Sequence, residues 1–220
     1  MRTSHLLALV NLAAAYCASA NLAHADVVTL TGATSAQYST ATEVAEFNAQ
    51  TNTFTFTITN TSAITQPGST STITGIGFDL PPAGNASASG LNGFTGTQAP
   101  SLSSSFIFSD AAVGSVPNFS GAVLDFAFLT GSSFATGNES LGLLPGESAS
   151  FTVTGAAFTG FTEAQIANSI ALYFQSVPIV GSDVAAPGAP NAVPEPATPL
   201  LAAAALLVLG CSAAGRRRSL

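Results

Sequence analysis

Hydrophobic and polar residues alternate most regularly between positions 51 and 59, where the sequence reads Thr-Asn-Thr-Phe-Thr-Phe-Thr-Ile-Thr. In an extended segment Phe54, Phe56 and Ile58 fall on one face, and threonines occupy the other. A period of two residues, built from β-branched and aromatic side chains, is typical of a strand with one buried face. The segment therefore predicts a half-buried β-strand.

Six further segments have strand-forming composition and are separated by clusters of Gly, Pro, Asn and Ser. Pro81-Pro82 and Pro145-Gly146 are predicted stops and turns, because proline cannot donate to a ladder and glycine tolerates turn geometry. Seven short strands with turn signals predict an all-β fold, a β-sandwich of jelly-roll or immunoglobulin-like type. The six further segments are 27–31, 72–80, 105–108, 122–129, 148–154 and 171–177.

One short helix is predicted near position 162. Thr162 is a suitable N-cap, and Gln165 follows three residues later, which completes a capping box. Phe161 and Ile166 have the spacing of a hydrophobic staple across the same helix end. The sequence therefore predicts a helix that begins after Thr162 and ends near Ser169.

The first 25 residues have the order of a secretory signal peptide. Arg2 precedes an apolar stretch over 6–17, and the small residues Ala23 and Ala25 precede the predicted cut. The apolar stretch is shorter than the roughly 20 residues that a membrane-spanning helix needs. We predict cleavage after Ala25, so that the exported chain begins at Asp26.

A second hydrophobic segment lies near the C-terminus. Residues 200–214 carry no charge, and Arg216, Arg217 and Arg218 follow them. A helix of that length is about 22 Å long, whereas the hydrocarbon core of a bilayer is about 30 Å thick. The predicted transmembrane helix therefore includes flanking residues and covers 198–215. The three arginines place the tail in the cytoplasm and the body of the protein outside.

A Pro-Glu-Pro element, a short hydrophobic helix and an arginine cluster follow one another over residues 193–218. This order resembles the PEP-CTERM sorting signal of Gram-negative bacteria. The resemblance implies recognition and cutting by exosortase, a membrane-embedded cysteine transpeptidase, with the three arginines as a cytoplasmic stop. It also implies transient anchoring in the inner membrane, and then a cell-surface or extracellular-matrix location beside exopolysaccharide, in a biofilm. The recognition residues that it implies are Val193, Pro194, Glu195 and Pro196.

Between the two targeting segments, the sequence predicts a folded body over 26–180 and a spacer over 181–192. The body has a suitable length for a single domain. The spacer is rich in Pro, Ala and Gly and shows no apolar periodicity. Such a composition predicts a segment that holds the body off the membrane.

The body is unusually poor in chemically reactive side chains. All basic residues and histidines lie before position 26 or after position 195, and the region between them also lacks Cys and Trp. Catalytic triads need a histidine base, and zinc sites almost always need His or Cys. The uncompensated carboxylates would also repel nucleic acid. We therefore expect a protein that is not an enzyme, that requires no cofactor and that has no nucleic-acid partner.

The sequence is also compatible with three alternative functions. A carbohydrate- or calcium-binding module is one, with Asp79 and Asn85 or Asp110 and Asn118 as candidate calcium pairs, since calcium takes oxygen ligands. The threonine row over 51–59 suggests a flat hydroxyl surface for ice or polysaccharide, provided that neighbouring strands repeat it. Paired carboxylates that hydrolyse glycosides are the enzymatic alternative. The candidate carboxylates are Glu43, Glu46, Asp79, Asp110, Asp125, Glu139 and Glu147.

Overall fold

The computed structural model describes residues 25–63, 68–81, 91–101, 103–110 and 124–187. These ranges contain ten strands and one short α-helix. The strands are β1 (Asp26–Gly32), β2 (Thr40–Asn48), β3 (Thr53–Asn60), β4 (Thr72–Phe78), β5 (Phe94–Gln98), β6 (Ile107–Asp110), β7 (Phe126–Leu129), β8 (Ser148–Gly155), β9 (Ile170–Val177) and β10 (Gly181–Pro187), and the helix is α2 (Glu163–Ala167).

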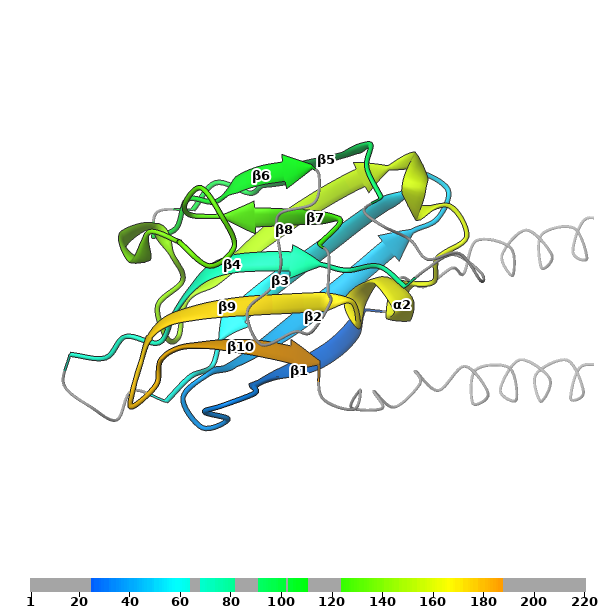
Figure 1. Cartoon of the computed structure of the whole chain (residues 1–220). Coiled ribbons are helices and arrows are strands. Elements are labelled where there is room, and N and C mark those ends of the chain that lie inside the picture. The colour runs from blue at the N-terminus through cyan, green and yellow to red at the C-terminus, as the bar shows by residue number, and fades with distance from the viewer. Residues whose placement is uncertain (1–24, 64–67, 82–90, 102, 111–123, 188–220) are drawn as a thin grey trace, which may run out of the picture.

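All ten strands belong to one antiparallel sheet, in the order β5-β8-β3-β2-β1-β10-β9-β4-β7-β6. The sheet folds over on itself, so that β5-β8-β3-β2-β1 (the first half) faces β10-β9-β4-β7-β6 (the second half), as Figure 1 shows. The far edges also approach each other, because a Cβ atom added to Gly96 of β5 would lie 2.2 Å from the Phe108 ring of β6. The predicted all-β fold is confirmed, with a sandwich-like arrangement of two layers.

Phenylalanine rings fill the space between the two layers. The ring centroids of Phe56 in β3 and Phe78 in β4 lie 5.1 Å apart, and those of Phe128 in β7 and Phe151 in β8 lie 4.7 Å apart. These four side chains are at most 1% exposed. Each buried aromatic ring removes about 150–250 Å² from water. Packing of this kind stabilises a domain whose own sequence offers neither basic side chains for ion pairs nor cysteines for disulfides.

A second, smaller apolar cluster covers the outer face of the second half. Phe134, in the segment after β7, lies over β4, where Gly75 and Gly77 leave room for its ring. A Cβ atom added to either glycine would come within 3.1 Å of a ring carbon of Phe134. The strand β4 is therefore buried along its whole length. The cluster comprises Leu124, Ala127, Leu129, Phe134, Ala171, Tyr173 and Val184.

Most of the predicted strands are confirmed. The predictions at 27–31, 51–59, 72–80, 148–154 and 171–177 correspond to β1, β3, β4, β8 and β9. The strand predicted at 105–108 lies two residues later, as β6, and of the prediction at 122–129 the structure shows β7, while 122–123 lie outside the described residues. Strands β2 and β5 were not predicted.

The prediction of a spacer over 181–192 is wrong for its first seven residues, which form β10. This strand lies between β1 and β9 and connects the two halves of the sheet. Val184 and Ala185 are fully buried, and Asp183 is 1% exposed. The folded domain therefore extends to Pro187, and residues 188–192 lie outside the described part.

The predicted capping box of the short helix is confirmed. The Thr162 amide donates to Gln165 Oε1 at 2.9 Å, and the Gln165 amide donates to Thr162 Oγ1 at 3.3 Å. The helix ends at Ala167, and it packs against β1 and β2. None of the described helices is long and apolar enough to cross a membrane. The predicted transmembrane segment at 198–215 lies outside the described residues.

Candidate functional site

Hydroxyl side chains cover the outer face of the first half of the sheet. The buried Phe54, Phe56 and Ile58 of β3 alternate with threonines that point outward, and the same alternation recurs on the neighbouring strands. We call this surface the hydroxyl face. Its members are Thr29, Thr31, Thr40, Thr42, Thr53, Thr55, Thr57, Thr59, Thr95, Thr97, Ser148, Ser150, Thr152 and Thr154.

Strand register arranges the hydroxyl face in rows. One row runs from Thr97 on β5 through Thr152 and Thr55 to Glu46 on β2. The row beside it runs from Thr95 through Thr154 and Thr53 to Asn48. On the other side of the first row, Ser150 and Thr57 are followed by the apolar Val44 and Val27, and the next row runs from Ser148 through Thr59 and Thr42 to Thr29. Thr40 and Thr31 pair beyond that row. Neighbouring side chains in a row are separated by the strand spacing of about 4.7–4.9 Å.

Hydroxyl groups within the rows bond to one another. Thr57 Oγ1 lies 2.7 Å from Ser150 Oγ, and Thr59 Oγ1 lies 2.8 Å from Ser148 Oγ. A hydroxyl carries one donor and two acceptor lone pairs, so each member of such a pair keeps further bonding capacity. Within these rows Glu46 is the charged residue, and the strands present no aromatic ring outward. The hydroxyl face can therefore form many weak, uncharged polar contacts.

Several carboxylates of the domain are used as acceptors for backbone amides. Asp183, buried in β10, accepts from the amides of Ser35 at 2.8 Å, Val184 at 2.9 Å and Thr34 at 3.1 Å. A carboxylate that accepts several backbone N–H groups stabilises a loop without any cation. This carboxylate fixes the turn between β1 and β2 to the strand that joins the two halves.

Asp125 and Asp110 have the same role near β5. Asp125 accepts from the amides of Leu80, at 2.8 Å, and Leu91. Burial raises the pKa of Asp125, the charge of Asp79 raises it further, and the two amides lower it. Asp110 accepts from the amides that begin β5, at 3.1 and 3.2 Å.

Two more candidate carboxylates also have local partners. Glu147 accepts from the amide of Leu144 at 2.8 Å, which closes the turn before β8. Glu139 accepts from the hydroxyl of Ser176 at 2.8 Å. The first contact stabilises a turn and the second binds a loop to β9, so both have a structural role.

Glu43 differs from the other acidic residues. It points inward from β2, between Val28 and Ile58 on the neighbouring strands, and it is fully buried. Neither carboxyl oxygen has a hydrogen-bond partner among the described residues. Burial raises the pKa of Glu43 well above its ordinary value, and the nearby charge of Asp26 raises it further. The protonated form of this side chain is therefore favoured in the folded domain.

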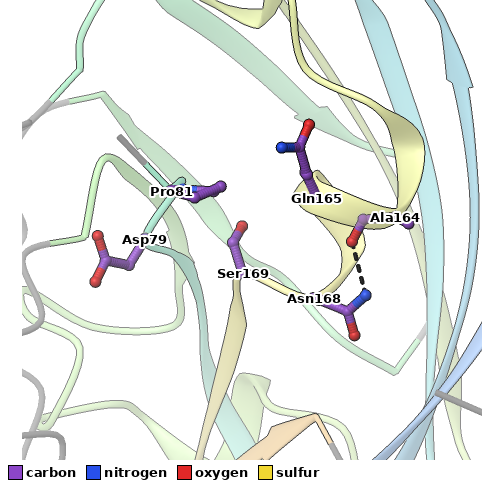
Figure 2. Close-up of a pocket in the computed structure, with 6 residues that line it drawn as sticks. All are labelled: Asp79, Pro81, Ala164, Gln165, Asn168 and Ser169. Atoms are coloured by element: carbon purple, nitrogen blue, oxygen red, sulfur yellow. Dashed lines mark hydrogen bonds between the residues drawn. The ribbon is translucent and has the colours of Figure 1, made fainter. Parts of the chain in front are cut away.

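A shallow cleft of about 390 Å³ lies between the end of β4 and α2. Figure 2 shows Asp79 on one side of it, with its carboxylate turned away from Gln165 and Asn168. The Asn168 side chain is bonded to the Ala164 carbonyl at 2.7 Å. Burial raises the pKa of Asp79. The charge of Asp79 interacts with the carboxyl group of Asp125. Asp125 already accepts hydrogen bonds from two backbone amides, so it is not free to act with Asp79 as an acid and base pair.

The predicted targeting residues lie largely outside the described part of the chain, as do Asn85 and Asn118 of the candidate calcium pairs. Within the described residues, no group of three His, Cys, Asp or Glu side chains could hold a metal ion. Of the predicted signal-cleavage residues, Ala25 is exposed and Asp26 begins β1.

The threonine row predicted on 51–59 is the part of the site that sequence reasoning found, and its extension to neighbouring strands was missed. One signal was available, because Ser and Thr also alternate with apolar residues over 148–154. Strands β2 and β5 gave no such signal. The face becomes visible only when the register of the sheet places its rows side by side.

Residues 192–218 match the PEP-CTERM protein-sorting motif, which confirms the resemblance found in the sequence. The motif defines the chain as an exported protein that exosortase sorts. Comparison of the chain with curated proteins, and with solved structures, finds no match.

Proposed function

We propose that the exported chain is a non-enzymatic component of the cell surface or extracellular matrix, cut by exosortase near Pro194-Glu195-Pro196. The sorting motif supports the route, and the hydroxyl face supports the role at the destination. The single observation that carries the role is that each of the five strands of the first half presents threonine or serine side chains on the same outer face.

The use of the carboxylates supports a role without catalysis. Asp110, Asp125, Asp183 and Glu147 accept hydrogen bonds from backbone amides, and Glu43 is buried away from solvent. Glycoside hydrolysis needs two carboxyl groups that face each other across a substrate. A carboxylate that already fixes a loop is poorly placed to exchange protons with a substrate.

An uncharged polysaccharide is the proposed partner of the hydroxyl face. The face is almost free of charge in a chain that is otherwise acidic, so an uncharged polymer approaches it without repulsion. It offers no ring on which a sugar can stack, so each contact is weak. A long polymer that crosses several rows makes many such contacts at once, which raises the overall affinity.

The twist of the sheet favours a flexible polymer over ice. Adjacent strands in a sheet rotate by about 20–25° relative to each other, and the hydroxyl face spans five strands. A planar crystal surface would fit only a small part of such a face. A polysaccharide chain can follow the twist.

Retention of the exported chain on an insoluble, uncharged β-glucan tests this proposal. We expect the wild-type chain to be retained. We expect the double variant Thr55→Glu/Thr97→Glu to be retained about tenfold less, because two carboxylates then interrupt one row. A charge-matched control, Ser105→Glu/Ser132→Glu, changes two exposed serines outside the hydroxyl face and should bind like wild type.

Three results would contradict the proposal. They are absence of wild-type retention, equal loss in the control variant, and binding only to an anionic polysaccharide in the presence of calcium. The last result would instead favour the calcium-binding alternative. Release of sugar from the glucan, abolished by a single carboxylate substitution, would show an enzyme.

A further inference from the structure

The exported body contains no basic side chain, and the whole chain contains no lysine. After removal of residues 1–25, its α-amino group would therefore be the first positive charge available to the domain. The place of that group can be read from the structure, because Asp26 begins β1.

The backbone nitrogen of Asp26 already lies beside a carboxylate. It donates to Glu163 Oε1 at 3.2 Å, and the other oxygen, Glu163 Oε2, accepts from the Phe47 amide at 2.7 Å. Glu163 is the first residue of α2, and Phe47 belongs to β2. One carboxylate thus connects β1, β2 and α2. Figure 1 shows α2 at the end of the sheet where β1 begins.

We propose that cleavage after Ala25 converts this amide contact into an ion pair between the new α-ammonium group of Asp26 and Glu163. In the reaction, which a signal peptidase would catalyse, water adds to the Ala25 carbonyl and the bond to the Asp26 nitrogen breaks. The signal peptide leaves with the new carboxylate. The released amine takes up a proton and becomes the ammonium group.

The ion pair makes the stability of the domain depend on removal of the signal peptide. A neutral amide donor becomes a charged donor at the same carboxylate, and hydrogen bonds between charged groups are stronger than neutral ones. The exported chain is therefore more stable than the same chain with a blocked or extended N-terminus. The contact joins the first strand to a helix that lies 137 residues further along the sequence.

The ion pair also makes stability depend on pH. A carboxylate raises the pKa of a neighbouring α-amino group above its ordinary range of about 7.7–8.0. The stabilisation is therefore complete below that range and is lost as the pH rises through the raised value. The titratable groups around the amine are Glu163 on α2, the Asp26 carboxyl on β1 and Glu43 on β2, whose pKa responds to Asp26.

The absence of lysine makes the experiment direct, because amine reagents modify only the α-amino group. The N-terminus of the exported chain is first mapped, and the rate of amine labelling is then measured against pH. We expect a start at Asp26 and an α-amino pKa raised by about half a unit. Selective Nα-acetylation should lower Tm by about 1–3 °C at pH 7.

Two variants identify the cause. In Glu163→Gln the labelling pKa should return to the ordinary range, and acetylation should no longer change Tm. In Glu147→Gln, a control that removes a carboxylate from a distant turn, both effects should persist. A start at another residue, an ordinary labelling pKa in the wild-type chain, or the same effect of acetylation in Glu163→Gln would overturn the proposal. If Glu163→Gln does not fold, the labelling curve of the wild-type chain alone tests the proposal, and an α-amino pKa in the ordinary range overturns it.

Discussion

The outer faces of the two halves of the sheet differ in how they are covered. The second half is covered by the chain itself, with Phe134 seated over Gly75 and Gly77. The first half presents rows of threonine and serine to solvent, and no described segment covers them. One fold therefore contains an outer face that is packed against its own chain and an outer face that is open to solvent among the described residues.

The largest effect is expected on the covered side. Phe134→Ala removes a ring that is 1% exposed and leaves a cavity over β4, so it should lower the free energy of unfolding by about 3–5 kcal/mol. Thr55→Ala on the hydroxyl face should change it by less than about 0.5 kcal/mol. Urea unfolding of the two variants measures the difference, and similar costs would show that the two faces are not distinct.

The junction between the halves should be the next most sensitive place. Asp183→Asn keeps the size of a side chain that accepts from Thr34, Ser35 and Val184, but removes its charge. Hydrogen bonds to a charged group contribute about 1.5–3 kcal/mol, so we expect a loss in that range. Asp183 would not be the stabilising contact of the junction if urea unfolding of this variant matched that of wild type.

Inside the first half, Glu43 should reduce stability at neutral pH. Because burial raises its pKa in the folded state above that of the unfolded chain, its favourable contribution is present at low pH and is lost as the pH rises through the raised value. Glu43→Leu should therefore raise the free energy of unfolding by about 1–3 kcal/mol at pH 8. At pH 4 the gain should be smaller.

Unfolding curves of wild type and Glu43→Leu at both pH values provide the measurement. A gain that is independent of pH would mean that the Glu43 carboxyl does not titrate in this range. A loss of stability at pH 8 would mean that the carboxylate has a favourable partner in solution.

The smallest effect is expected on the hydroxyl face. Thr57→Val preserves shape and removes one partner of the bond to Ser150, which the solvent can replace, so stability should change by less than about 0.5 kcal/mol. Retention on uncharged β-glucan should nevertheless decrease. A stability loss without any change in retention would make this face a purely structural surface.

Sequence patterns predicted the strands in which large apolar residues alternate with threonine or serine, as in β3 and β8. They failed for β2, because its inward positions are Ala41, Glu43, Ala45 and Phe47, and a single large apolar residue leaves no periodic signal. Burial of Glu43 is decided by the neighbouring strands, which the local sequence does not encode.

Strand β10 could not be predicted from its local sequence either. Its sequence Gly-Ser-Asp-Val-Ala-Ala-Pro has the composition of a linker, yet Asp183 and Val184 are buried between two strands. Its pairing partners are β1, more than 150 residues earlier in the chain, and β9, its immediate neighbour. The capping box of α2 could be predicted because both of its hydrogen bonds lie within four residues.

We expect the working protein to be a processed, exported chain. This is tested by the intact mass of the protein recovered from cells and medium, with both terminal peptides mapped. We predict a chain that starts at Asp26 and ends near Pro194-Glu195-Pro196, and any added mass would identify an attached molecule. A recovered chain that keeps Arg216, Arg217 and Arg218 would contradict it, because the tail would then be a permanent anchor.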